Sequence, residues 1–367
     1  MTTAQPLVLM MAGGTGGHVY PALAVARELL ERGFRVEWVG TRRGLEQRVV
    51  PAAGIKLHHL SVRGVRGKGM MDKLAAIFSL ALSSIQALWL VLRVRPGCVV
   101  GMGGYAAGPA GVAAWLMRRP LVIHEQNAVA GTTNRLLAPM AKKVIAGFPD
   151  AFVSEIPFEV LGNPVRREMI EAAAIDDYDY NGQRPLRLLV LGGSLGARPI
   201  NDVLPAAVRA LKADSATAQL DVWHQTGEAH AQLVTESYGD LCPGAVRVMP
   251  FIEDMASAYR WADLVLCRAG ALTVAELAIM GRPSILVPLP HAIDDHQTAN
   301  ARSLSDRGGA ILLRQSDLSE SALVDAISAY VEFPSRLQAM AVAASAAGEP
   351  QATVRVADCC QELLHGQ

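Results

Sequence analysis

One pattern occurs twice in this chain and constrains its fold more than any other feature. An apolar run, a glycine-rich turn and a helical segment follow one another directly. In the first copy, Leu7–Ala12 leads into GGTGGH at 13–18, and a segment from Pro21 has apolar residues at helical spacing. In the second copy, LRLLVL at 186–191 leads into GGSLGA at 192–197 and a helical stretch from Pro199. Each half of the chain is therefore predicted to contain a strand, a glycine loop and a helix.

Further short apolar runs alternate with helical segments, both between the two copies and after the second. This alternation is typical of parallel sheets joined by right-handed helical crossovers. We expect an α/β protein with two doubly wound, Rossmann-like domains that face each other across a cleft. The other expected strands are 35–40, 98–101, 121–124, 144–146, 221–224, 264–267 and 284–287.

The length of 367 residues exceeds the size at which one hydrophobic core usually stops growing. Asn163-Pro164 and then IDDYDYNGQRP at 175–185 interrupt the periodicity with turn formers and acidic residues. We expect an N-terminal domain at 1–162, a C-terminal domain at 163–345, and a last helix within 346–367 that packs back on the N-terminal domain.

Charge and cysteine usage exclude several classes of protein. The formal net charge is zero, which gives no support to a nucleic-acid partner. The five cysteines form no CxxC pair, so neither a disulfide framework nor a zinc site is indicated, and a reducing cytosol suits them. No Lys or Arg precedes the run at 7–12, which we interpret as a strand rather than a secretory signal.

Glycines at a strand-to-helix turn let backbone N–H groups approach an anion, and phosphate is the obvious candidate. No GxxxxGK[ST] string occurs, so the loops are not of the Walker A type. A nicotinamide-binding fold usually has an acid at the end of its second strand, whereas here that strand ends at Gly40 and Glu37 lies within it. A plain tight turn remains the alternative for one loop, and two matched loops count against it.

Five more motifs follow in order: GMGGY at 101–105, HEQNAVAG at 124–131, GNPVR at 162–166, RAGALTVAEL at 268–277 and HAIDDHQTAN at 291–300. With the two glycine loops, they make the chain resemble the MurG family of GT-B glycosyltransferases over essentially its whole length. The resemblance implies inverting transfer of N-acetylglucosamine from UDP-N-acetylglucosamine to the muramyl 4-hydroxyl of lipid I, which gives lipid II in peptidoglycan synthesis. It implies no cofactor, and a cytoplasmic protein peripheral to the inner face of the cell membrane.

Other functions stay open beside this one. A GT-B transferase for another lipid acceptor is the nearest alternative, and a sugar-nucleotide-binding protein without turnover is a second. A nicotinamide enzyme is the third. The sequence does not identify any cell-wall or cell-division protein as a partner.

The stretch 268–276 has the character of a helix N-terminus, whose small residues would admit a diphosphate and whose Glu276 could accept hydrogen bonds from two vicinal hydroxyls. The alternative is an ordinary solvated helix glutamate. The resemblance implies that this stretch holds UDP and that Glu276 takes the ribose. The donor-binding residues that it implies are Thr15, Gly16, Gly17, Asn127, Arg166, Ser194, Ile252, Ala271, Leu272, Thr273, Val274, Ala275, Glu276 and Gln297.

The loops at 13–18 and 103–105 resemble a cradle for the pyrophosphate of the acceptor, which implies acceptor contacts from Gly13, Gly14, Gly103, Gly104, Tyr105 and Glu125. His18 ends the first loop, and a histidine can take the proton of an attacking hydroxyl because its pKa lies near neutral pH. We expect His18 to be the general base. The competing interpretation is that it caps backbone or binds phosphate.

Two acidic patterns suggest a metal without supporting one. Asp177-Tyr178-Asp179 matches the Asp-x-Asp string of metal-dependent transferases, but it lies in a polar linker and is better explained as a solvated turn. His291, Asp294, Asp295 and His296 could likewise suggest a metal, but Asp294 and Asp295 stand where a helix cap is expected. No essential metal is predicted.

The stretch Leu74–Leu92 has no charged residue and is long enough to span a bilayer. Serines and a glutamine interrupt it, so we predict a crossover helix with one face on the sheet and the other at a membrane surface. Residues 61–119 contain eight Lys or Arg and one acid, which suits an anionic membrane surface. A plain buried helix with solvated basic ends is the alternative. The expected membrane face includes Met71, Phe78, Trp89, Lys68 and Lys73.

Overall fold

The computed structural model describes residues 5–62, 70–153, 155–193, 195–214, 217–290 and 295–365, without the side chains of residues 70–77. The chain forms two compact units: unit 1 is Met1–Arg166 with Pro350–Gln367, and unit 2 is Arg167–Glu349. Both divisions lie four residues after the predicted ends of the domains at residues 162 and 345.

Unit 1 is built on a parallel sheet with the strand order β3-β2-β1-β4-β5-β6-β7 within the described residues. The run that was expected to be the first strand is β1, and it pairs with β2 and β4. The strands of unit 1 are β1 Leu7–Met11, β2 Arg35–Gly40, β3 Lys56–His59, β4 Cys98–Gly101, β5 Leu121–Glu125, β6 Lys143–Ala146 and β7 Glu159–Val160. Its helices are α1 Gly16–Glu31, α2 Glu46–Ala52, α3 Met70–Val94, α4 Ala107–Leu116, α5 Thr132–Leu137 and α14 Ala352–His365.

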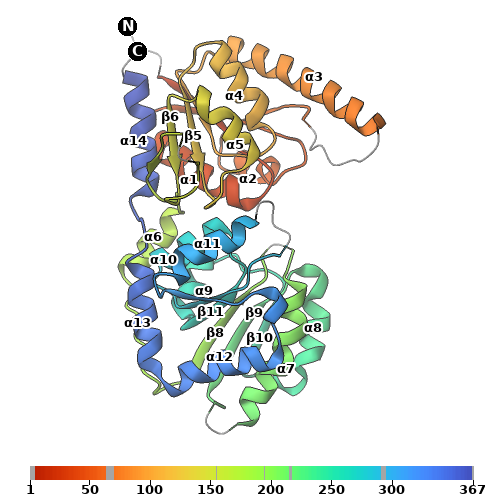
Figure 1. Ribbon diagram of the computed structural model, residues 1–367, viewed down its shortest axis with the longest axis vertical. Coiled ribbons are helices and arrows are strands. Elements are labelled where there is room, and N and C mark those ends of the chain that lie inside the picture. The colour runs from red at the N-terminus through yellow and green to blue at the C-terminus, as the bar shows by residue number, and fades with distance from the viewer. Residues whose placement is uncertain are drawn as a thin grey trace. The chain divides into compact units, whose positions relative to one another are not determined.

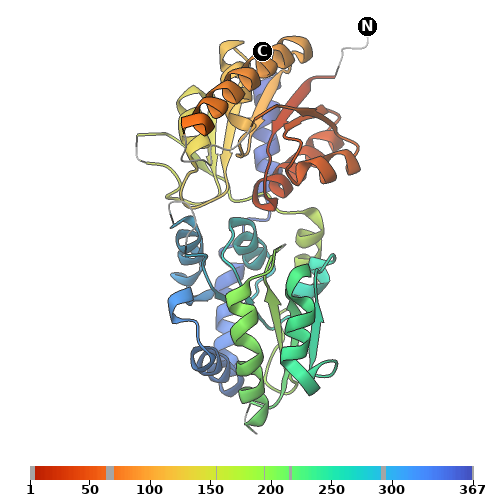
Figure 2. The same cartoon turned by 90° about the vertical axis from the view of Figure 1, so that its right-hand side faces the viewer.

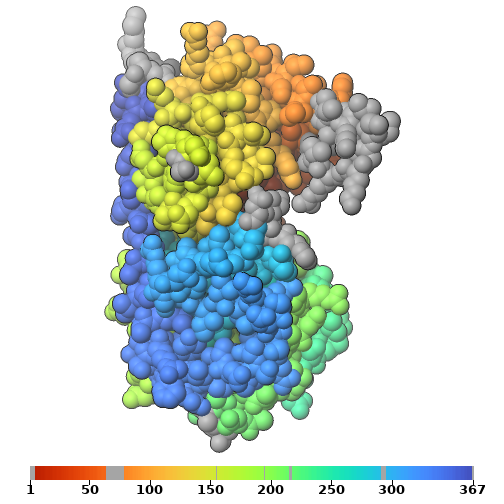
Figure 3. Space-filling model, viewed as in Figure 1, coloured from red at the N-terminus to blue at the C-terminus, as the bar shows by residue number. Residues whose placement is uncertain are grey.

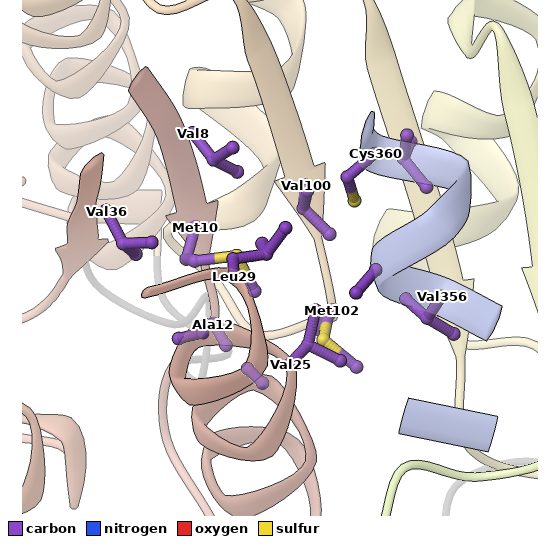
Figure 4. Packing of buried hydrophobic residues seen from close by; sticks show 14 of the residues in the cluster. Val8, Met10, Ala12, Val25, Leu29, Val36, Val100, Met102, Val356 and Cys360 are labelled. Atoms are coloured by element: carbon purple, nitrogen blue, oxygen red, sulfur yellow. The ribbon is translucent and has the colours of Figure 1, made fainter. Parts of the chain in front are cut away.

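Two apolar clusters cover the opposite faces of this sheet, because alternate residues of a strand point to opposite sides. Val8 and Met10 of β1 pack with α1 and with α14, whereas Leu9 and Met11 pack with α3 and α4. Figure 4 shows the first cluster, in which Val356 and Cys360 of α14 approach residues of the strands and of α1.

The last helix, α14, belongs to unit 1 although unit 2 separates it from the rest of that unit in sequence. It lies along α1 and contacts β4 (Figure 1). Two ion pairs attach α14 to the rest of unit 1. Arg32, just after α1, donates to Asp358 at 2.7 Å, and Lys143 of β6 donates to Glu362 at 3.0 Å. Figure 3 shows the blue surface of α14 adjoining the yellow middle segment of the same unit.

Unit 2 repeats the architecture with the parallel order β10-β9-β8-β11-β12-β13 within the described residues. Its strands are β8 Leu186–Leu191, β9 Leu220–Gln225, β10 Val246–Met249, β11 Leu264–Cys267, β12 Ser284–Leu286 and β13 Ala310–Leu312. Its helices are α6 Arg167–Ala174, α7 Arg198–Ala213, α8 Ala231–Tyr238, α9 Met255–Trp261, α10 Ala271–Ile279, α11 His296–Ser305, α12 Glu320–Glu332 and α13 Pro334–Ser345. Helix α7 packs against α8, which lies beside it in Figure 2, and against α12.

Candidate active site

Each sheet has one point at which the strand order reverses, between β1 and β4 in unit 1 and between β8 and β11 in unit 2. In such folds ligands bind beyond the carboxyl ends of the strands at this switch point. The glycine loops 13–18 and 192–197 follow β1 and β8 directly, and the segments 102–105 and 268–270 follow β4 and β11. Four of the motifs found in the sequence therefore flank the two switch points.

In unit 1 the two loops at the switch point are in direct contact. A Cβ atom at Gly104 would lie 2.4 Å from the carbonyl oxygen of Gly13, and Gly104 has φ +89°. A Cβ at Gly103 would lie 2.8 Å from Nδ1 of His18. Both positions therefore require glycine, because any side chain would separate the loop after β4 from the loop after β1. Tyr105, next in the chain, is exposed.

The first helix begins earlier than the sequence indicated. It starts at Gly16, with Thr15 as its N-cap residue, and Pro21 lies inside it rather than in its first turn. The proline removes one backbone donor, yet the apolar residues that follow it bury the helix against β1. His18 consequently lies in the first turn of α1, where its backbone N–H donates to Thr15 O at 3.2 Å.

Glu46, which sequence reasoning missed, holds the first glycine loop in place. Its buried carboxylate accepts from the backbone N–H of Gly14 at 2.9 Å and from both N–H and Oγ1 of Thr41 at 2.8 Å. The only available signal was an acid in the first turn of a helix, which is too common to single it out. The N–H of Gly14 is therefore engaged by a carboxylate.

Glu125, at the end of β5, is almost fully buried and organises the loop that follows it. Its Oε1 accepts from the backbone and side-chain N–H groups of Asn127, and its Oε2 accepts from Gly131 N–H and Asn134 Nδ2, all within 3.1 Å. The acceptor contact expected from Glu125 stays a prediction. The structure places this carboxylate inside the loop that also presents Asn127.

In unit 2, Gln225 has the bracing role that Glu46 has in unit 1. Its Oε1 accepts from Gly192 N–H at 3.1 Å, and its Nε2 donates to the carbonyl oxygens of Gly193 and Pro250. A Cβ at Gly196 would lie 2.0 Å from the Thr226 carbonyl oxygen, so this glycine is also required. Ser194, an expected donor contact, lies outside the described residues.

Helix α10 begins at Ala271 after the N-cap residue Gly270, as the motif indicated. Glu276 lies in the second turn of the helix, is 5 % exposed, and accepts a hydrogen bond from the Tyr259 hydroxyl at 3.2 Å. Burial, with the nearby Glu276 carboxylate, raises the pKa of the Cys267 thiol to about 12. Cys267 is 1 % exposed and is packed in the core of unit 2.

The other expected donor residues lie at several places in the fold. Gln297, in the first turn of α11, accepts from Leu289 N–H at 3.0 Å just after β12. Ile252 is buried after β10. Arg166 belongs to unit 1, where its guanidinium lies 5.6 Å from the centre of the Tyr20 ring.

No group of three or more His, Cys, Asp or Glu side chains that could hold a metal occurs among the described residues. Asp179 accepts from Arg184 at 3.0 Å, and the same guanidinium also contacts Asp263. Asp295 is the N-cap residue of α11 and accepts from Thr298 Oγ1 at 2.8 Å, whereas His291 and Asp294 lie outside the described residues.

Helix α3 presents an apolar surface, defined as Phe78, Leu82, Ile85, Trp89 and Leu92. These residues recur at intervals of three and four and so share one helix face, and Phe78 and Trp89 are 72 % and 58 % exposed. None of the helices within the described ranges has the length and apolarity needed to cross a membrane. Lys68 and the side chains of Met71 and Lys73 lie outside the described residues.

Two Rossmann-like domains, each with a glycine-rich loop at its switch point, have the architecture called GT-B. Residues 8–146 match the glycosyltransferase family 28 N-terminal domain, and residues 187–356 match the glycosyltransferase family 28 C-terminal domain. The chain belongs to glycosyltransferase family 28.

Particular relatives match it over nearly its full length. A UDP-N-acetylglucosamine--N-acetylmuramyl-(pentapeptide) pyrophosphoryl-undecaprenol N-acetylglucosamine transferase of Alkalilimnicola ehrlichii is 54 % identical over 97 % of this chain and 98 % of the relative. The Stutzerimonas stutzeri protein of the same name is 51 % identical over 98 % of this chain and 99 % of the relative. The crystal structure of Acinetobacter baumannii MurG has a TM-score of 0.81, with 40 % identity over 97 % of this chain and 99 % of that one.

Proposed function

We infer that this chain transfers N-acetylglucosamine from UDP-N-acetylglucosamine to the muramyl 4-hydroxyl of lipid I, which gives lipid II in peptidoglycan synthesis. The observation that carries the inference is the match, at about half of all positions and over nearly the whole chain, to relatives named for this transfer. The glycine loops at both switch points support it, because one reaction must hold a diphosphate on the donor and a pyrophosphate on the acceptor.

We propose that the donor binds at the switch point of unit 2. The N-terminus of α10 offers backbone N–H groups and a partial positive charge to the diphosphate of UDP, and the small residues Gly270 and Ala271 leave room for it. Glu276 would accept from the ribose hydroxyls. The hydrogen bond from the Tyr259 hydroxyl supports this role, since it helps to orient the buried carboxylate.

The acceptor site is proposed at the switch point of unit 1, with its pyrophosphate against the loops 13–18 and 103–105. His18 would remove the proton of the 4-hydroxyl as the hydroxyl oxygen bonds to the anomeric carbon of the donor. The bond between that carbon and the diphosphate oxygen breaks at the same time, on the opposite face, so the configuration inverts. UDP leaves with the bonding electron pair, and Arg166 and the α10 N-terminus are the groups expected to offset its charge.

We further propose that the apolar surface of α3 meets an anionic membrane. Arg93, Arg95, Arg118, Trp89 and Trp115 are all exposed, and no Asp or Glu occurs between Asp72 and Glu125 in the sequence. Arg93 lies 5.0 Å over the Trp89 ring. Apolar and basic side chains side by side on packed helices suit the interface between acyl chains and anionic headgroups.

The decisive test is product formation by the full chain with UDP-N-acetylglucosamine and lipid I in detergent. We expect one UDP released for each lipid II formed, and no reaction without lipid I. Two control reactions change one substrate each. The first uses UDP-glucose as the donor, and the second uses undecaprenyl-pyrophosphoryl sugars without the muramyl peptide as acceptors. Faster turnover of another lipid acceptor would favour the alternative of a GT-B transferase with a different product, and UDP binding without turnover would contradict an enzyme.

A further inference from the structure

A chain of hydrogen bonds in unit 1 runs from a backbone carbonyl through two buried side chains to His18. The imidazole Nε2 of His124 lies 3.0 Å from the carbonyl oxygen of Gly162. The Nε2 of Gln126 lies 3.3 Å from Nδ1 of His124, and the Oε1 of Gln126 lies 3.0 Å from Nδ1 of His18. His124 and Gln126 are 0 % and 1 % exposed, so water does not compete for the contact between them, and the contact with His18 is partly buried.

The direction of this chain follows from what each group can donate. A carbonyl oxygen only accepts, so the hydrogen of His124 lies on Nε2. A neutral imidazole has one N–H, which leaves Nδ1 of His124 as an acceptor and requires the amide nitrogen of Gln126 to face it. The amide oxygen of Gln126 then faces His18, and Nδ1 of His18 must carry the hydrogen.

The reverse direction would place the amide oxygen of Gln126 against His124, which would then need hydrogens on both ring nitrogens. Burial lowers the pKa of His124 to about 4, although the Gly162 hydrogen bond and the Glu125 carboxylate act in the opposite sense. The doubly protonated ring is therefore a minor form at neutral pH.

We propose that Gln126 and His124 are positioning residues that fix the ring tautomer of His18, with the hydrogen on Nδ1 and the lone pair on Nε2. The inference rests on the proposed function in one respect, the role of His18 as base. A base must present a lone pair to the hydroxyl, and the Nδ1–H tautomer makes Nε2 the nitrogen that does so. Gly103 assists, because its missing side chain lets the loop lie against the imidazole ring.

The first experiment reads the tautomer directly and needs no substrate. The full chain is labelled with ¹⁵N-histidine, the His18 signals are assigned by their loss in His18→Ala, and the ring nitrogens are observed by NMR above pH 7. We expect Nδ1 of His18 protonated and Nε2 unprotonated, and a mixture of tautomers in Gln126→Leu. An Nε2–H tautomer in the unaltered chain, or no change in Gln126→Leu, would overturn the proposal.

The second experiment measures turnover on lipid I. We expect Gln126→Leu to lower kcat by about tenfold or more with the KM for UDP-N-acetylglucosamine unchanged, since the base acts in the transition state. Gln126→Glu should recover most of the loss, because one carboxyl oxygen still accepts from Nδ1–H of His18, and a proton shared between the other oxygen and Nδ1 of His124 replaces the amide N–H donor. A loss in both variants alike would mean that the residue serves packing only and would overturn the proposal.

The matched control is a second buried histidine. His224 of β9 contacts Asn201 and Tyr238 in unit 2, and burial lowers its pKa to about 3. We expect His224→Leu to leave the His18 tautomer unchanged. Full activity of His18→Ala would refute the base assignment in the proposed function, while the NMR result would still decide the role of Gln126.

Discussion

The Oε2 atom of Glu46 accepts a hydrogen bond from the backbone N–H of Gly14 at 2.9 Å, which ties the start of α2 to the first glycine loop. The same carboxylate accepts two further hydrogen bonds from Thr41 at the end of β2. A buried anion with three donors thus fixes the position of a loop that has no side chains of its own to pack at 13 and 14.

Glu46→Gln should destabilise unit 1 by about 2 kcal/mol, because the amide keeps only one oxygen and buries an NH₂ group among donors. Urea unfolding followed by fluorescence measures the change. The control is Glu28→Gln, which breaks the partly exposed pair with Arg32 and should cost less than about 1 kcal/mol. Equal effects of the two substitutions would show that Glu46 does not brace the loop.

His18→Ala should lower turnover on lipid I by about a hundredfold or more and change UDP-N-acetylglucosamine affinity little, because a general base acts mainly in the transition state. Initial rates at saturating substrates and calorimetry with UDP give the two quantities. The assignment is refuted by the opposite result, a matching loss of donor affinity with turnover preserved at saturation.

Glu276→Ala should weaken UDP binding by about 2 to 3 kcal/mol, since two ribose hydroxyls would lose a charged acceptor. Tyr259→Phe removes only the hydroxyl that donates to Glu276 and serves as the matched control, with an expected loss below about 1 kcal/mol. Calorimetry with UDP and with uracil distinguishes the ribose contribution. Unchanged affinity in Glu276→Ala would place the ribose elsewhere.

Replacing Phe78 and Trp89 by Ser should reduce binding to vesicles that contain anionic lipid and reduce turnover on long-chain lipid I. It should spare turnover on a short-chain, water-soluble acceptor analogue. Both side chains are largely exposed, so little packing is lost. Binding of the unaltered chain should also weaken as salt rises, because screening shortens the reach of the basic residues.

The control for the Phe78 and Trp89 variant replaces Leu233 and Val342 by Ser. Both are exposed apolar residues of unit 2. This control should leave vesicle binding unchanged. If the Phe78 and Trp89 variant lost activity equally on both acceptors, the membrane face would have to lie elsewhere.

Because burial lowers the pKa of His124, we expect the free energy of unfolding to decrease as the solution becomes more acidic. The pKa of His124 is lowered to about 4 in the folded chain, whereas an unfolded histidine has a pKa near 6.5, so between these values the unfolded state binds more protons. The free energy of unfolding should therefore decrease as pH falls from about 6.5 to about 4, by about 3 kcal/mol for such a site. Urea unfolding at a series of pH values tests this, and His124→Leu should show a shallower dependence. Identical slopes would contradict it.

The sequence predicted those elements whose residue types and spacing are characteristic by themselves. The apolar runs that became β1 and β8, the glycine loops after them, and the small residues at the start of α10 were all identified from residue type and spacing. The predicted start of α1 was wrong. Pro21 is a strong local signal for the first turn of a helix, whereas the burial that extends the helix back to Gly16 depends on residues far away in the sequence.

Gln126 and Glu46 could not be singled out in advance, because nothing in their sequence neighbourhoods reveals which group each one contacts. The sequence by itself determined the class of fold, the two glycine loops and the family, since periodicity and motif order are properties of the chain. Only the tertiary structure decided that Gly104 meets Gly13, that Glu46 holds Gly14, and that Gln126 connects His124 to His18. Apart from the contact between Gln126 and His124, these contacts join residues far apart in sequence, and they exist because parallel strands bring the loops at their carboxyl ends together at one edge of the sheet.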